Sequence, residues 1–78
     1  MQASTVKLYP NPATEHLFIQ AYDDPGDVTV EIYTVSGRLA ARFQQVHNRI
    51  NVSELDPGLY IVAIKSRRGT ETQKITIH

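Results

Sequence analysis

The sequence predicts an all-β domain, a small antiparallel β-sandwich of about seven strands. Apolar and polar residues alternate with a period of two through most of the 78 residues, as they do in half-buried strands. Turn-forming residues interrupt this alternation at short, nearly regular intervals, and no segment has the 3.6-residue period of an amphipathic helix. The chain has no cysteine, so its stability depends on sheet pairing and core packing without a disulfide.

The first two strands are expected on either side of a chain reversal. One begins at residue 6 and the other covers residues 17–22, where apolar residues alternate with others. Between them, the prolines of "YPNP" (9–12) fix their own φ angles and keep the residues before them out of the α region. Asn11 and Pro12 suit the first two positions of a type I turn in which the asparagine side chain accepts a hydrogen bond from nearby backbone.

Five more strands follow in order. They are "VTVEIYTV" (28–35), "LAARFQQV" (39–46), "RINVSEL" (49–55), "LYIVAIK" (59–65) and "TETQKITIH" (70–78), separated by the turns "DDPGD", "SGR", "DPG" and "SRRG". The segment 59–65 is apolar on both faces, which predicts a central strand covered from both sides. This arrangement is typical of an immunoglobulin-like sandwich, although the cysteine pair and the tryptophan of that fold are missing.

The charge is balanced overall but unevenly distributed. Residues 1–31 carry a net charge of −4 and residues 32–78 a net charge of +4. We expect strands from the two halves to interleave, which would even out the asymmetry. No basic stripe is interleaved with aromatic residues, so nucleic acid is not an expected partner. No apolar run of about 18 residues and no signal peptide is visible. If the domain lies outside the cytoplasm, its export signal is therefore expected elsewhere in a longer precursor.

No set of residues predicts catalysis or a cofactor. His16, His47 and His78 lack the spacing of a ligand pair, and neither Ser36 nor Ser53 has the partners that would activate a nucleophile. The scattered glycines do not form a phosphate-binding loop. We therefore predict that the chain is not an enzyme and has no cofactor or metal. A calcium loop at "DDPGD" (23–27) is the alternative metal site that the residue types leave open.

A second functional class is a carbohydrate-binding or adhesive immunoglobulin-like module appended to an enzyme. Such a module would expose a row of aromatic side chains, for which the four tyrosines are the candidates: Tyr9, Tyr22, Tyr33 and Tyr60. Tyrosine is also simply favoured in strands, where its ring packs and its hydroxyl stays wet.

Four motifs together carry a resemblance to a known family. "LYPNPATEHLFI", "VEIYTVSGRLA", "INVSELDPGLYIVAI" and "QKITI" occur in that order over residues 6–78. They resemble the C-terminal sorting domain, type A, of proteins exported by the type IX secretion system of Gram-negative Bacteroidota. The positions that match the family's motifs are Tyr9, Pro10, Asn11, Pro12, Gly37, Arg38, Leu55, Gly58, Tyr60 and Lys74.

Two positions depart from the family pattern. Thr34 stands where relatives often have aspartate, so we expect the loss of an Asx-turn acceptor in the hairpin that follows. His78 stands where lysine or arginine is more usual, which argues against a requirement for a terminal positive charge.

The resemblance implies that the domain is a sorting signal. The precursor would cross the inner membrane by means of an N-terminal signal peptide and pass through the periplasm. The outer-membrane translocon would recognise the C-terminal domain, and a cell-surface sortase, a cysteine peptidase, would remove it. Residues 6–78 would be the sorting domain. Met1 would be an introduced start, and the other residues of 1–5 the remnant of a linker.

These motif residues divide into two expected roles. Gly37 and Gly58 would be structural, because glycine adopts backbone conformations that other residues resist, and Tyr60 would belong to the core. Arg38 and the proline corner (residues 9–13) would contact a partner. Lys74 lies in a final strand that we expect at a sheet edge, where a lysine either prevents unwanted pairing or serves recognition. The isolated domain would be a monomer or a strand-swapped dimer.

Overall fold

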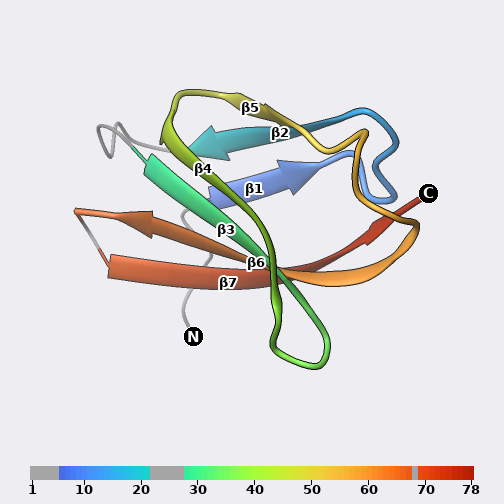
Figure 1. The fold of residues 1–78 in the computed structure, drawn as a ribbon. Helices are drawn as coiled ribbons and strands as arrows, with labels where there is room; N and C mark the ends of the chain where they lie inside the picture. The colour runs from blue at the N-terminus through green and yellow to red at the C-terminus, as the bar shows by residue number, and fades with distance from the viewer. Residues whose placement is uncertain (1–5, 22–27, 68) are drawn as a thin grey trace, which may run out of the picture.

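Seven strands make up the part of the chain that the computed structural model describes, residues 6–21, 28–67 and 69–78 (Figure 1). They are β1 (Val6–Tyr9), β2 (His16–Ala21), β3 (Val28–Thr34), β4 (Leu39–Val46), β5 (Arg49–Asn51), β6 (Gly58–Ser66) and β7 (Gly69–Ile77). No helix occurs within these ranges, so none there could span a membrane. The all-β class and the seven strands are as the sequence predicts.

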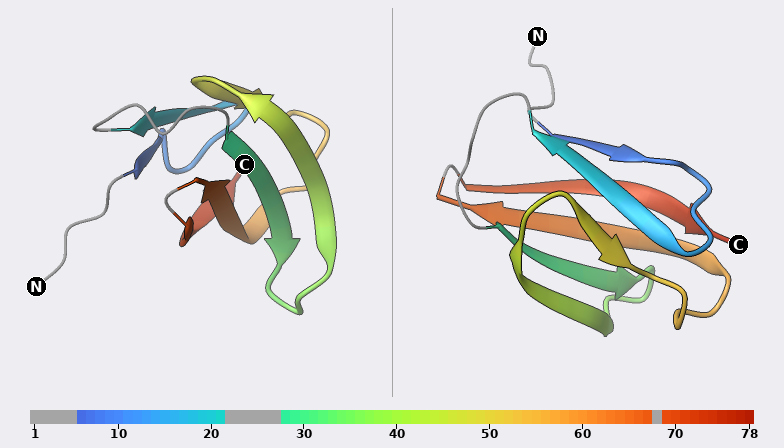
Figure 2. Two further views of the ribbon diagram at one scale, coloured as in Figure 1. Left: turned by 90° about the vertical axis from the view of Figure 1, so that its left-hand side faces the viewer. Right: turned by 90° about the horizontal axis from the view of Figure 1, so that it is seen from above.

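The strands form two antiparallel sheets that pack face to face as a sandwich (Figure 2). One sheet has the order β1-β2-β5, and the other has the order β4-β3-β6-β7. The two-residue period of each strand directs one set of side chains into the space between the sheets. The buried apolar residues are Val6, Leu8, Ala13, Leu17, Ile19, Val28, Val30, Ile32, Val46, Ile50, Val52, Tyr60, Val62, Ala63, Ile64, Ile75 and Ile77.

The outer face of strand β6 is more exposed than the sequence predicts. It is central, as predicted, because it pairs with β3 on one side and β7 on the other. Val62 and Ile64 are buried in the core, but Leu59 is 47% exposed. In the described ranges, only neighbouring side chains of the same sheet cover the outer face of β6. The prediction of cover on both faces is therefore wrong at Leu59.

The β3–β4 hairpin is built around Gly37. The Gly37 N–H donates to the Thr34 carbonyl at 2.9 Å, and the Thr34 N–H donates to the Arg38 carbonyl at 2.8 Å. Gly37 has a φ of +95°, which suits a type I turn followed by a glycine bulge. The Thr34 hydroxyl accepts a hydrogen bond from the Arg38 N–H at 3.1 Å. The expected loss of a side-chain acceptor is therefore wrong, because the threonine hydroxyl occupies that role.

The corner between β1 and β2 reverses the chain as predicted, but with a different geometry. The Tyr9–Pro10 and Asn11–Pro12 peptide bonds are both cis. The Asn11 side chain accepts from the Thr76 N–H at 2.9 Å instead of from a neighbouring residue. The prediction that Asn11 accepts a hydrogen bond from nearby backbone is therefore wrong.

The two halves of the chain interleave less than expected. Residues 6–21 supply two strands of the three-stranded sheet, whereas every strand of the four-stranded sheet comes from residues 28–77. On the outer face of the four-stranded sheet, the described bases Arg42, Lys65 and Lys74 outnumber the single described acid, Glu31. This face keeps the basic excess of the C-terminal half.

The exposure of the two faces predicts different costs of truncation. We expect Ile32→Ala to lower the free energy of unfolding by about 2–5 kcal/mol, because it opens a cavity in the core. Leu59→Ala, the matched control on the exposed outer face, is expected to cost less than about 1 kcal/mol. Urea unfolding of both variants checks this, and equal losses would contradict the assigned core.

Candidate functional site

The motif residues gather at one end of the four-stranded sheet. At this end β3 and β7 finish and β4 and β6 begin, so Thr34 pairs with Tyr60 and Gly58 pairs with Ile77. The loop between β1 and β2 lies beside the last residues of β7, next to the C-terminus (Figure 1). We call this region the motif end and define it as residues 9–13, 34–39, 55–60 and 74–78.

The proline corner is bound to the end of β7. The Ala13 N–H donates to the Thr76 carbonyl at 2.9 Å, and the His78 N–H donates to the Ala13 carbonyl at 2.8 Å. Together with the bond from the Thr76 N–H to Asn11 Oδ1, these contacts form a short parallel bridge between Ala13 and Ile77. Ala13 is fully buried. The first and last motifs of the sequence are therefore one structural unit.

The other residues of the proline corner lie at the surface. Pro10 and Pro12 are exposed and have no N–H to donate. Tyr9 ends β1 on the outer face of the three-stranded sheet, where its ring stacks on that of Phe18 with 5.5 Å between centroids. Tyr9 therefore belongs to the outer face of the three-stranded sheet, whereas the prolines lie in the loop that follows β1.

The motif of Leu55, Gly58 and Tyr60 ties the loop before β6 to the core. The buried Tyr60 ring confirms its predicted place in the core, and its hydroxyl donates to the Asp56 carbonyl at 2.6 Å. Leu55 packs partly buried against the core, and its N–H donates to the Val52 carbonyl at 3.1 Å. The hydroxyl bond satisfies the polar end of a buried ring, as in the tyrosine corner of immunoglobulin-like folds. This motif therefore sets the shape of the motif end.

Two motif cations lie exposed at the surface. Arg38 lies at the tip of the β3–β4 hairpin, and within the described ranges its guanidinium makes no hydrogen bond or ion pair. Its neighbours Val35 and Leu39 are large hydrophobic residues that are also exposed. Lys74 is exposed on β7, in register with Ile61, and no described acid pairs with it. The motif end thus offers two cations, one beside an apolar surface.

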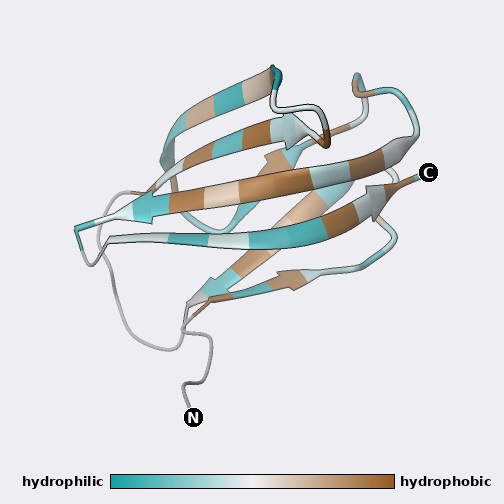
Figure 3. Ribbon diagram, turned by 90° about the horizontal axis from the view of Figure 1, so that it is seen from below, coloured by the Kyte–Doolittle hydropathy of each residue, from teal (hydrophilic) through white to brown (hydrophobic). Residues whose placement is uncertain are grey.

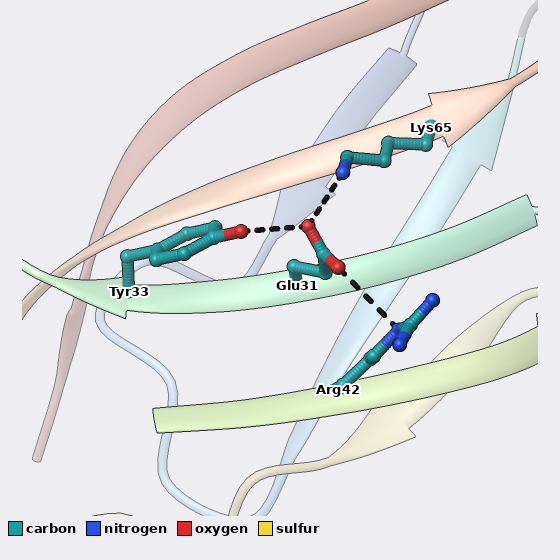
Figure 4. A network of polar contacts seen from close by, with 4 residues as sticks. All are labelled: Glu31, Tyr33, Arg42 and Lys65. Carbon is teal, nitrogen blue, oxygen red and sulfur yellow. Dashed lines mark hydrogen bonds and ion pairs between the residues drawn. The ribbon is translucent and has the colours of Figure 1, made fainter. Parts of the chain in front are cut away.

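Sequence reasoning missed a polar network on the outer face of the four-stranded sheet (Figure 4). Glu31, only 7% exposed, accepts a bond from Tyr33 Oη at 2.7 Å. Lys65 Nζ lies 2.8 Å from Glu31 Oε1, and Arg42 Nε lies 3.4 Å from Glu31 Oε2. The network joins β4, β3 and β6, so it depends on a strand order that alternation along the sequence does not reveal.

The network fixes the charge of its members. The hydrogen bond from Lys65, followed by that from Tyr33, holds the pKa of Glu31 below its ordinary value. The same bonds to Glu31 raise the pKa of Lys65 and the pKa of Tyr33. A carboxylate held ionised by two hydrogen-bond donors and a nearby guanidinium braces the sheet and is poorly suited to proton transfer.

The described residues do not form the tyrosine row of a carbohydrate platform. Tyr9 lies on the three-stranded sheet, Tyr33 is bonded to Glu31 on the other sheet, and Tyr60 is in the core. Tyr22 and the "DDPGD" turn (23–27) lie outside the described residues. Within the described ranges, no three His, Asp or Glu side chains gather as a metal site.

The lowered pKa of Glu31 predicts a loss of stability in acid. The stabilising effect of its charge is present above the ordinary value of 4.5 and is lost as the pH falls through the lower pKa of the folded state. We expect Glu31→Gln to be less stable than the wild type at neutral pH and the difference to shrink in acid. Thermal unfolding across this pH range measures the effect. Glu54→Gln, at an exposed glutamate, is the control, and a pH-independent deficit in Glu31→Gln would contradict the assignment.

The contact of Asn11 with β7 predicts a local loss of order. We expect Asn11→Ala to lower the free energy of unfolding by about 1 kcal/mol, because the Thr76 N–H loses its acceptor. Amide hydrogen exchange at Thr76 should speed up more than exchange at Val62 in the centre of β6. Asn48→Ala, at an exposed asparagine, is the control, and unchanged exchange at Thr76 would contradict the contact.

A comparison with protein families covers nearly the whole chain. A family model described as "Secretion system C-terminal sorting domain" matches residues 7–78, from β1 to the end of β7. No curated protein matches the chain. The family match therefore spans every segment of the motif end. The chain belongs to the family of C-terminal sorting domains of the type IX secretion system.

Proposed function

We propose that this domain directs a larger cargo protein through the outer-membrane translocon of the type IX secretion system and is recognised as a folded surface at the motif end. Membership of the family makes the chain a type IX sorting signal, and thus part of a secreted or cell-surface precursor. The observation that carries the proposal is the convergence of four separate motifs at one end of one sheet. A linear signal does not need such a folded assembly.

The motif residues would divide into those that shape the surface and those that contact the translocon. Asn11 supports the first role through its contact with a backbone N–H, and Gly37 through its positive φ. Gly58 supports it through its strand pairing, and Tyr60 through its buried ring. The second role falls to exposed residues, which are Pro10, Pro12, Arg38 and Lys74. An exposed cation without a described partner can pair with an acidic group of a receptor at little cost.

The rest of the route follows from the same proposal. The precursor would carry an N-terminal signal peptide, pass through the periplasm of a member of the Bacteroidota, and lose this domain to a cell-surface sortase. Residues 6–78 would be the sorting domain, and the cleaved bond would lie at or before residues 1–5. A carbohydrate-binding role has less support, because Tyr9, Tyr33 and Tyr60 lie apart.

Variants of the neighbouring residues Arg38 and Gly37 distinguish a loss of recognition from a loss of folding. In a reporter that carries a signal peptide and ends in this chain, we expect Arg38→Ala to reduce export without lowering the melting temperature, because its side chain is exposed. Gly37→Val should reduce export by unfolding the domain, since a β-branched residue at a φ of +95° costs about 1–3 kcal/mol. Export assays and thermal unfolding of both variants give the comparison.

The necessary control is a strain that lacks the translocon, in which the wild-type fusion should stay inside the cell. Export that is equal in both strains would overturn the proposed function. A large fall in melting temperature for Arg38→Ala would instead remove Arg38 from the contact surface.

A further inference from the structure

The four sheet edges of this sandwich are protected to different degrees. β1 has four residues, and its Val6 carbonyl accepts from Gln73 Nε2 at 2.7 Å. β5 has only three residues. β4 pairs with β3 through two register shifts, and its Gln45 has a φ of +55°. Short strands and bulges of this kind prevent a further strand from pairing. β7 has nine residues in unbroken register with β6, so its edge lacks this protection.

The middle of the β7 edge presents backbone groups that are ready to pair. In an antiparallel strand, the N–H and C=O of alternate residues point to the same side. Both groups of Thr76 point away from β6, because they bond to the proline corner. The same groups of Thr70, Thr72 and Lys74 therefore also point away from β6. No other described residue bonds to them.

The proline corner pairs with one end of the β7 edge and marks where the unpaired part of that edge ends. Ala13 adds to β7 as a single parallel bridge at Ile77. Beyond it, Asn11 offers a side-chain oxygen, and the flanking prolines have no N–H to continue the ladder. The corner therefore closes the edge at Thr76–His78 and leaves it open over Thr70–Lys74.

The charge of the surrounding face indicates what would pair there. Lys74 is exposed without a described acid, and Lys65, in register with Thr70, already binds Glu31. In Figure 3, β6 is mainly hydrophobic while β7 is hydrophilic over most of its length, so side-chain burial contributes little at this edge. An incoming strand would gain mostly from backbone hydrogen bonds and from an acidic side chain near Lys74.

A second copy of the chain fits this edge less well. A symmetric antiparallel pairing centred on Thr72 would place Lys74 of one copy opposite Thr70 of the other, in the same row as Lys65. Two like charges would then share one row of the joined sheet. In the same pairing, the β6–β7 hairpin of each copy would approach Thr76 of the other, where the proline corner already lies.

We infer that the β7 edge from Thr70 to Lys74 docks an extended, acidic segment of the export machinery as a fifth strand of the four-stranded sheet. This inference rests on the proposed function. It makes Lys74 a recognition cation, and the backbone of Thr72 a second contact.

The test uses the reporter fusion in a strain with an intact type IX system. Thr72→Pro removes an outward N–H and leaves the inward ladder to β6 intact, while Thr72→Val keeps that N–H and is its matched control. Lys74→Glu reverses the charge at the edge. Lys7→Glu, at an exposed position of β1, is its control. We expect Thr72→Pro and Lys74→Glu each to reduce export about tenfold, the loss expected for one charge-assisted or backbone contact. Both controls should be exported like the wild type.

Export of Thr72→Pro and Lys74→Glu at the wild-type level would overturn the inference while leaving the proposed function standing. Failure of the wild-type fusion to be exported would overturn both. A lower melting temperature of Thr72→Pro would attribute its loss of export to unfolding. The export of Lys74→Glu, at an unchanged melting temperature, is then the deciding result. Sedimentation of the purified 78-residue chain should show a monomer. A dimer that Thr72→Pro dissociates would assign the edge to a second copy and overturn the inference.

Discussion

The hydrogen bonds between the proline corner and the last residues of β7 are the constraint on which the motif end depends. They join Ala13 to Thr76 and His78 across almost the entire length of the chain. A contact between segments so far apart does not form locally, because the loop that it closes contains nearly every other strand. The core between the two sheets must already hold both segments in place. In return, the bridge covers one end of the β7 edge and helps to bury Ala13 and Ile77.

The Glu31 network plays a comparable part on the outer face of the four-stranded sheet. In the described part of the chain, no second layer covers this face, so the sheet cannot rely there on the apolar packing that holds its inner face. Tyr33 of β3, Arg42 of β4 and Lys65 of β6 converge on one carboxylate instead. These contacts tie neighbouring strands together and keep the face polar.

The sequence predicts the strands well because a two-residue period is a local property. It predicts strand β3, with Val28, Val30 and Ile32 on one face, because each of these residues alternates with one that faces outward. It does not predict the partner of Asn11, whose side-chain oxygen accepts from a residue 65 positions along the chain. Nor does it predict the three partners of Glu31, which lie on different strands. Thr34 shows a further limit, since its hydroxyl accepts the hydrogen bond whose loss the sequence predicts at this turn. The convergence of the family motifs at one end is a property of the fold, which their order along the sequence does not reveal.

The position of Thr76 and His78 within the bridge has a consequence for the timing of biosynthesis. A nascent chain holds its most recently added residues inside the ribosomal tunnel, where they cannot reach Ala13. The bridge can therefore form only after residue 78 has been made and has emerged. Under the proposed function, a truncated translation product that lacks these residues has an incomplete motif end and is not recognised for export.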